Sequence, residues 1–259
     1  MNMRSADNHA KVLLWISLGQ LLSLLEMAGA IGYTAGMTSK EQGMAIKAVI
    51  FDMDGLLFDT ETLGVKACQQ AGLLQNLDVS EELILSTLGM TTERSSEAYL
   101  TAHPSLDLDR YWDDYRQIML DYAGASGPPL MPYAQQLLDW LDEEGLAIGL
   151  CSANQPRLVF AYLEGAGLTE RFQAIVHGRP DLPSKPAPDM FLLTAQLLDV
   201  APGDCLVLED SPNGVKAGRA AGMMVAMVPD MIPFSEELRP YCDLVLDDLS
   251  QVPAIVKGG

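Results

Sequence analysis

Residues 45–61 read AIKAVIFDMDGLLFDTE, and they carry the clearest indication of how the chain folds. Its first part, residues 45–51, is a short apolar run rich in β-branched residues, and its length and composition predict a buried strand. The run ends at Asp52-Met53-Asp54-Gly55, where the glycine predicts a turn. The sequence therefore predicts a buried strand whose carboxyl end carries two acidic side chains.

Strands and helices alternate through the second half of the chain. Similar apolar runs predict strands at residues 146–150, 174–177, 205–208, 224–228 and 244–246. The spacing of apolar residues predicts helices at residues 133–144, 156–165, 188–198 and 213–221. This alternation is typical of an α/β fold in which helices cover both faces of a parallel sheet.

The segment between the first two predicted strands breaks the alternation. It carries helical patterns at residues 64–74, 81–88, 93–101 and 108–123, and no convincing strand. It closes at residues 124–129, which read GASGPP and have the composition of a linker. We therefore predict an all-helical insert after the first strand.

Composition and charge limit the classes of partner. The chain has 259 residues, of which 49% are hydrophobic, so it can bury a sizeable core. Its formal net charge of -19 repels the phosphates of nucleic acids, and we expect no nucleic-acid partner. No pair of its four cysteines has the C-x-x-C spacing of a zinc or redox site, which favours a reducing compartment. We also expect a monomer.

The first 44 residues have two interpretations. Residues 12–37 are largely apolar and follow Arg4 and Lys11, as in a signal peptide or a membrane anchor. Alternatively, residues 1–44 are an over-extended start, because Met44 opens a natural beginning for a cytosolic domain. We favour the second interpretation and expect a cytoplasmic protein, with membrane attachment or export as the alternative.

Polar residues follow several predicted strands, and the carboxyl ends of parallel strands form one crevice where ligands bind. The residues are Asp52 and Asp54, Ser152 in Cys-Ser-Ala-Asn, Lys185 in Ser-Lys-Pro-Ala-Pro-Asp, and the pair Glu209 and Asp210. Each alone has a structural explanation, such as a helix cap or a solvated turn. Together, and in this order, they predict an active site.

The acidic members of this set predict a magnesium site. Packed carboxylates raise one another's pKa unless a cation intervenes, and an all-oxygen cluster suits Mg²⁺. The predicted metal set is Asp52, Asp54, Glu209 and Asp210. Lys185 adds a positive charge, and the Ser152 hydroxyl and strand-end backbone N–H groups, including that of Ala153, can bind phosphoryl oxygens.

The two acids at the first strand have separable roles. The Asp52 carboxylate can attack phosphorus and form an aspartyl-phosphate. The Asp54 carboxyl can protonate the leaving oxygen and then deprotonate a water molecule. A calcium loop fits less well, because such a loop follows a helix and has glycine at its sixth position, whereas Gly55 is fourth here.

The motifs resemble those of the haloacid dehalogenase-like (HAD) superfamily, in its β-phosphoglucomutase-like branch, over about residues 45–250. The stretch 52–61 is similar to the first motif, Ser152 to the second, Lys185 to the third and the stretch 209–214 to the fourth. The resemblance implies a Rossmann-like core formed by residues 45–60 and 128–259, with residues 61–127 as a helical cap.

The resemblance also implies site roles. Asp52 would be the nucleophile and Asp54 the acid/base. Mg²⁺ would be held by Asp52, the Asp54 carbonyl and Asp210, with Glu209 nearby. The presence of Asp54 argues against a dehalogenase and for phosphoryl transfer.

The expected activity is a Mg²⁺-dependent phosphatase acting on a small phosphomonoester, such as a sugar phosphate. The alternative is a sugar-phosphate mutase. The mutase is less favoured because residues 88–92, which correspond to its phosphate-binding cap segment, contain no basic residue, and Arg94 is out of register. A rival from another class is a membrane-anchored binding protein that uses residues 1–44 as the anchor and the cap as a partner surface.

Overall fold

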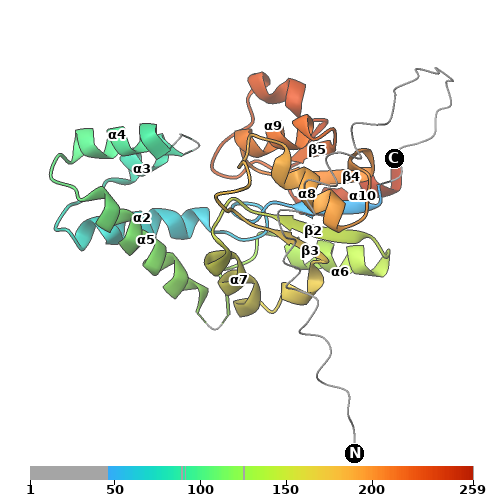
Figure 1. The fold of residues 1–259 in the computed structure, drawn as a ribbon, viewed down its shortest axis with the longest axis horizontal. Coiled ribbons are helices and arrows are strands. Elements are labelled where there is room, and N and C mark those ends of the chain that lie inside the picture. Colours follow the sequence, from blue (N-terminus) through green and yellow to red (C-terminus); the bar gives the residue numbers. More distant parts are fainter. Residues whose placement is uncertain (1–45, 89, 91, 125, 259) are drawn as a thin grey trace, which may run out of the picture. The chain divides into compact units, whose positions relative to one another are not determined.

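The protein is built on a parallel sheet of six strands in the order β3-β2-β1-β4-β5-β6 (Figure 1). The structure is a computed structural model that describes residues 46–88, 90, 92–124 and 126–258. The strands are β1 (Ala48–Phe51), β2 (Ala147–Cys151), β3 (Ala174–Val176), β4 (Cys205–Glu209), β5 (Met224–Met227) and β6 (Leu244–Val245). This sheet confirms the predicted α/β, Rossmann-like fold class.

The strand order places β1 at the point where the chain changes direction across the sheet. The chain builds β2 and β3 on one side of β1 and then crosses to β4 on the other side. Phe51 at the end of β1 pairs in parallel register with Leu150 of β2 and with Leu208 of β4. The residues that follow these strands therefore meet outside a topological switch point, where α/β sheets bind ligands.

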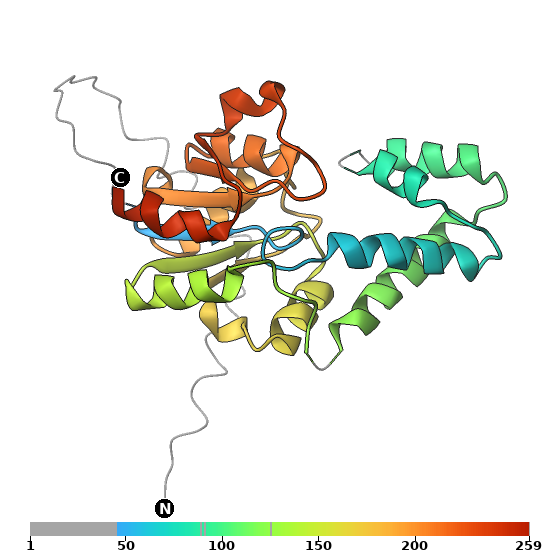
Figure 2. The ribbon, with the colours of Figure 1, turned by 180° about the vertical axis from the view of Figure 1, so that it is seen from behind.

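Helices cover both faces of the sheet because successive strand side chains point to opposite sides. In β1, Val49 and Phe51 pack into one core and Ala48 and Ile50 into the other. The first face carries α6 (Ala134–Glu143), α7 (Pro156–Gly165) and α10 (Val252–Gly258), and the second carries α8 (Asp189–Leu197) and α9 (Pro212–Ala220) (Figures 1 and 2).

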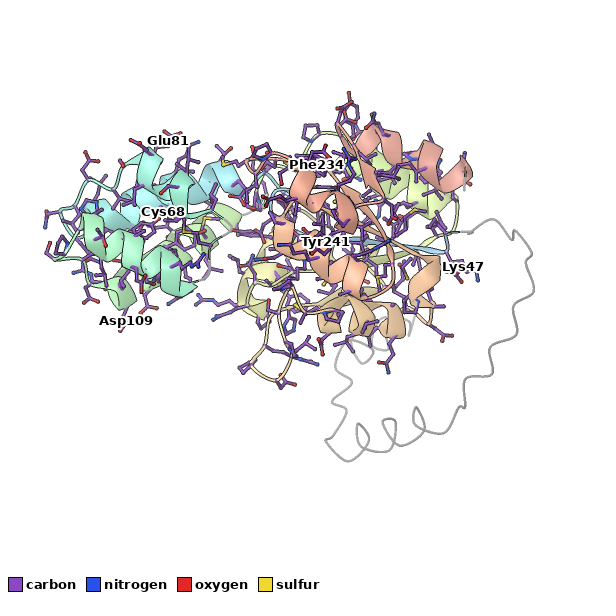
Figure 3. The ribbon with its side chains drawn as sticks, turned by 90° about the horizontal axis from the view of Figure 1, so that it is seen from above. Lys47, Cys68, Glu81, Asp109, Phe234 and Tyr241 are labelled. Carbon is purple, nitrogen blue, oxygen red and sulfur yellow. The ribbon has the colours of Figure 1, made fainter. Side chains whose placement is uncertain are left out.

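The segment between β1 and β2 forms four helices with a core of their own. They are α2 (Glu61–Leu73), α3 (Glu81–Thr87), α4 (Thr92–Ala102) and α5 (Leu108–Ala123), here called the helical insert. Cys68 lies inside it, whereas Glu81 and Asp109 are on its outer surface (Figure 3). The Tyr111 hydroxyl donates a hydrogen bond to the Cys68 carbonyl at 3.0 Å, which ties α5 to α2.

The six strands and eight of the helices lie on the runs that were predicted. The sequence patterns did not predict α10 or the short 3-10 helices η1 (Thr169–Arg171), η2 (Pro202–Asp204), η3 (Glu236–Tyr241) and η4 (Leu249–Gln251). Such segments have too few turns to show a helical period. The assignment of residues 61–127 as a separate cap domain stays a proposal.

The N-terminal predictions fall on residues that are not described. The predicted extension, residues 1–44, and its apolar stretch at 12–37 lie outside the described part of the chain. Within the described residues, no helix combines the length and the apolar character that crossing a membrane requires.

The insert leaves and re-enters the core through two adjoining backbone segments. The N–H of Asp59 donates to the carbonyl of Pro129 at 2.9 Å, and the N–H of Met131 donates to the carbonyl of Leu57 at 3.0 Å. Beside them, helix α7 approaches the linker so closely that a Cβ at Gly165 would lie 2.6 Å from the Gly127 nitrogen. The joint therefore requires glycine at residue 165.

We predict that Gly165→Ala destabilises the protein. The added methyl group would meet backbone atoms of Gly127 and Ala123, which cannot move aside as a side-chain tip can. We expect the free energy of unfolding in urea to fall by about 1–3 kcal/mol, despite the better helix propensity of alanine. Gly203→Ala is the control, because a Cβ there meets nothing within 4 Å. Equal stability of the two variants would refute the close approach.

Candidate active site

Asp52 lies directly after β1, at the switch point of the sheet. Its backbone N–H continues the ladder to β4 by donating to the carbonyl of Leu208 at 3.0 Å. Its carboxylate accepts a hydrogen bond from Lys185 Nζ on Oδ1 and one from the Asp54 backbone N–H on Oδ2, at 3.0 Å. The residue is 8% exposed. The carboxylate is therefore held in one orientation at an open edge of the core.

Lys185 is the buried cation of the site. Its ammonium group donates to the Asp52 carboxylate and to Glu209 Oε1 at 2.6 Å. A third bond goes to the Cys151 carbonyl at 2.8 Å, and the group lies 4.9 Å from the centre of the Phe191 ring. Burial lowers the pKa of the lysine, but Asp52 and Glu209 outweigh it and hold the pKa well above its usual value. The ammonium therefore stays charged.

Glu209 supports Lys185 from the end of β4. It is fully buried, and while its Oε1 accepts from Lys185, its Oε2 accepts from the Ser211 N–H at 3.2 Å and the Ser211 hydroxyl at 3.0 Å. A Cβ at Gly214 would lie 1.8 Å from the Glu209 carboxylate, so only glycine lets the first turn of α9 pack there. Both oxygens of Glu209 are thus already engaged within the protein.

Asp54 is held by two side chains. The Thr60 hydroxyl donates to its Oδ1 at 2.9 Å, and the Asn154 amide donates to its Oδ2 at 2.6 Å. The Asn154 backbone N–H in turn donates to Ser152 Oγ at 3.1 Å. Burial, more than any neighbouring charge, raises the pKa of Asp54 to about 6. A carboxyl with this pKa can give up and take back a proton near neutral pH.

The acidic cluster has the donors that a magnesium ion requires. Asp52, Glu209 and Asp210 offer carboxylate oxygens that lie within 4.8 Å of one another, and the Asp54 carboxylate is not in this group. Burial and mutual repulsion raise the pKa of Asp52 and of Asp210 well above the usual value. The single ammonium group of Lys185 does not balance the charge of these carboxylates, so the cluster keeps an excess of negative charge. Its donors are all oxygen atoms, which fit Mg²⁺.

Two adjoining cavities open at the site. A smaller one, of about 230 Å³, is lined by Asp52, Lys185 and Asp210 among others. A larger one, of about 900 Å³, is lined mainly by residues of the helical insert and of the first turn of α7. Both cavities share the residues Asp54, Glu61, Leu88, Ala153 and Asn154. The larger cavity therefore leads directly to the carboxylates.

All the residues predicted from the sequence lie at this one end of the sheet. Ser152 differs in detail from the expectation: it is fully buried, its hydroxyl meets the Asn154 N–H, and it does not line either cavity. Thr60, Asn154 and Ser211 were not predicted to take part in the site. All three stand inside the quoted motifs: Thr60 and Ser211 lie within six residues of a site carboxylate, and Asn154 follows Ser152 by two residues. This proximity was the available indication. The roles assigned to the predicted residues stay proposals.

Comparison with known proteins identifies the relatives of this chain. Residues 46–222 match the family model of the haloacid dehalogenase-like hydrolases. The "Probable pseudouridine-5'-phosphatase" of Drosophila melanogaster is 34% identical over an alignment of 220 residues that covers 78% of this chain and 89% of that protein. The "Beta-phosphoglucomutase" of Bacillus subtilis is 30% identical over an alignment of 225 residues that covers 80% of this chain and 95% of that protein.

A solved structure supports the fold. The HAD hydrolase of family IA, variant 3, from Entamoeba histolytica superposes with a TM-score of 0.70, covering 82% of this chain and 98% of that one. The two sequences are 21% identical, so the likeness concerns the fold alone.

We predict that the metal-free protein loses stability as the pH rises. Asp52, Asp54 and Asp210 all have a folded-state pKa above the usual value of 3.8, so the folded state binds more protons than the unfolded state between about pH 4 and pH 7. We expect the free energy of unfolding to fall by at least about 1 kcal/mol from about pH 5 to about pH 7.5. Mg²⁺ should restore more stability at the higher pH.

Asp210→Asn provides the control for this prediction. The variant keeps the shape of the side chain and removes one buried charge, so both the fall with pH and the gain from Mg²⁺ should shrink. Urea unfolding at the two pH values, with and without Mg²⁺, measures both effects. A variant that responds to pH and Mg²⁺ as the native protein does would place the effect elsewhere in this acidic chain.

Proposed function

This chain belongs to the haloacid dehalogenase-like hydrolases, and from that premise we propose that it is a Mg²⁺-dependent phosphatase of small phosphomonoesters. The observation that carries the proposal is the pair of carboxylates after β1. Asp52 is held by Lys185, and Asp54 is held by Thr60 and Asn154, on the wall of one cavity. Hydrolase membership and a relative named as a phosphatase support the same enzyme class.

In the proposed reaction Asp52 attacks the phosphorus atom of the ester. Its Oδ1 is engaged by Lys185, and among the described residues its Oδ2 accepts a hydrogen bond only from the Asp54 N–H, so a lone pair of Oδ2 can approach the substrate. The new bond joins the carboxylate oxygen to phosphorus while the bond from phosphorus to the leaving oxygen breaks. An aspartyl-phosphate results, which replaces one difficult displacement by two easier ones.

Asp54 manages the proton in both steps. It donates a proton to the leaving oxygen in the first step, and it accepts one from the attacking water in the second. The hydrogen bonds from Thr60 and Asn154 hold its carboxyl group over the junction of the two cavities. Thr60 and Asn154 are thus proposed positioning residues.

The charge on the phosphoryl group is balanced by the cations of the site. Lys185 supplies one positive charge from the protein, and the backbone N–H groups that follow β2, among them that of Ala153, supply further donors. Mg²⁺, held by Asp52, Asp210 and the Asp54 carbonyl, would neutralise phosphoryl oxygens and favour transfer. Ser152 contributes by ordering the loop through Asn154.

We further propose that residues 61–127 act as a cap over the site. Glu61 of α2 and Leu88 beyond α3 line the same small cavity as Asp52 and Lys185. Enclosing the substrate between the insert and the sheet would exclude bulk water and strengthen the electrostatic contacts of the transferred group.

A mutase remains the second candidate because a relative that covers most of the chain is named β-phosphoglucomutase. Such an enzyme must hold a bisphosphate and return a phosphoryl group to another hydroxyl. Arg94, the basic residue closest to the relevant segment, lies on α4 and does not line either described cavity. The geometry therefore gives the mutase no second phosphate site at that residue.

We predict that Asp52→Asn abolishes phosphate release. The amide keeps the shape of the carboxylate and its place beside Lys185, but it is a very poor nucleophile. With a panel of phosphomonoesters and Mg²⁺, kcat should fall by at least about 1,000-fold, and chelation of Mg²⁺ should stop release by the native protein. Asp109→Asn, on the outer surface of α5, is the matched control and should keep full activity.

The same assay separates the phosphatase from its rivals. Release that persists in Asp52→Asn would exclude Asp52 as the nucleophile. Isomerisation of a sugar phosphate that depends on a bisphosphate primer, without net release of phosphate, would establish the mutase instead.

A further inference from the structure

We propose that Glu61 selects substrates whose leaving group is uncharged and rich in hydroxyl groups, such as a polyol or a sugar. This inference rests on the proposed phosphatase activity and names the class of ester that the same site would accept. Glu61 would act as a specificity-determining residue that touches the leaving group, separate from the groups that carry out phosphoryl transfer.

Glu61 lies where the two cavities adjoin. It is the first residue of α2, and it lines both the small cavity with Asp52 and Lys185 and the large cavity of the insert. The preceding residue, Thr60, donates its hydroxyl hydrogen bond to Asp54 Oδ1 at 2.9 Å. Glu61 therefore stands beside Asp54, the proposed acid/base. The substrate atoms next to the leaving oxygen would enter the large cavity at this point.

The carboxylate of Glu61 has unused hydrogen-bonding capacity. The carboxylate is half-buried, and among the described residues no group forms a hydrogen bond or an ion pair with it. Of the other carboxylates of the site, Asp52 and Glu209 meet Lys185 and Asp54 meets Thr60. Asp210, a member of the proposed metal cluster, also has no such partner among the described residues. Because the carboxylate is partly open to solvent and not committed to a protein group, its oxygens can exchange water for the hydroxyl groups of a bound ligand.

Several acidic side chains lie near Glu61. Burial and then the neighbours Asp54, Asp230 and Asp59 raise the pKa of Glu61 to about 7. The surroundings are therefore anionic, and a second anionic group on the leaving group would be repelled. Whether ionised or protonated, a carboxyl group can hydrogen-bond hydroxyl groups, and it can meet two of them at once.

The large cavity gives the leaving group room. Its volume of about 900 Å³ exceeds what a phosphate alone would fill, and its wall includes the polar side chains Thr87 and Gln155. Arg116 and Arg157 also line the cavity, and Arg157 has no acidic partner among the described residues. An anionic group bound by Arg157 is therefore the competing arrangement, and the experiment must distinguish it from a polyol.

The test uses esters that differ only in the leaving group. Glycerol 3-phosphate and sorbitol 6-phosphate are the polyol esters, propyl and hexyl phosphate are their hydroxyl-free counterparts, and 3-phosphoglycerate replaces the terminal hydroxymethyl group by a carboxylate. The kcat and KM values are measured with Mg²⁺ for the native protein, Glu61→Ala, Glu61→Gln and the exposed control Glu82→Ala.

We expect the native protein to prefer the polyol esters. Glu61→Ala should lower kcat/KM for them by about 10-fold to 100-fold, and change kcat/KM for the alkyl phosphates by less than about threefold. Glu61→Gln keeps an acceptor and removes the charge, so it should lose less on the polyols and gain on 3-phosphoglycerate. Glu82→Ala should match the native protein on every ester.

Two results would overturn the inference. An equal loss on polyol and alkyl esters in Glu61→Ala would mean that Glu61 serves the shared chemistry or the fold. A native preference for 3-phosphoglycerate or for the alkyl esters would mean that the cavity selects another class of leaving group.

A binding measurement keeps this inference separate from the proposed function. If the native protein cleaves none of the esters, the phosphatase proposal fails on its own. Calorimetric binding of sorbitol 6-phosphate to Asp52→Asn, with and without Glu61→Ala, then tests the contact directly. Weaker binding in the double variant by about 10-fold or more would support the role of Glu61, and equal binding would overturn it.

Discussion

The ammonium group of Lys185 is the interaction on which the rest of the site depends. It reaches Asp52 after β1, Glu209 at the end of β4 and the carbonyl of Cys151 at the end of β2, so one cation joins three neighbouring strands. Without it, the buried carboxylates would repel one another at the centre of the sheet, at a cost that burial makes large. The candidate active site is thus a group of buried carboxylates whose mutual repulsion destabilises the fold. Lys185 offsets part of that repulsion, and a divalent cation could offset more.

The strand order explains why the buried carboxylates are accessible to a ligand. Because β1 lies between β2 and β4, the loops after these strands diverge above it and leave an opening at Asp52. The helical insert departs from the same place, since α2 begins only nine residues after Asp52. Thr60 and Glu61 at its start therefore take part in the site while the body of the insert supplies the wall of the larger cavity.

The sequence predicted the fold and the acidic centre because both follow from strand ends. When an apolar run ends at an acidic residue, that residue lies at the carboxyl edge of the sheet, whatever the details of packing. For this reason Asp52, Glu209 and Asp210 could be predicted to lie close together. The partners of Asp54 could not be predicted in this way. Whether Thr60, Asn154 or Ser152 faces the cavity depends on loop dihedrals and on burial, and no periodic pattern encodes these. Ser152 proved to be buried behind Asn154.

The joint between Leu57 and Met131 has a consequence for how such a protein can diversify. Since the outgoing and returning backbones are hydrogen-bonded to each other, the core presents the insert with two chain ends at a fixed, short separation. The entropy of closing a loop between fixed ends grows only slowly with its length. Helical segments of different size and side-chain content could therefore be exchanged at this joint while the strand register stays unchanged. Under the proposed division of roles, the insert could thus change in sequence without altering the residues that surround Asp52.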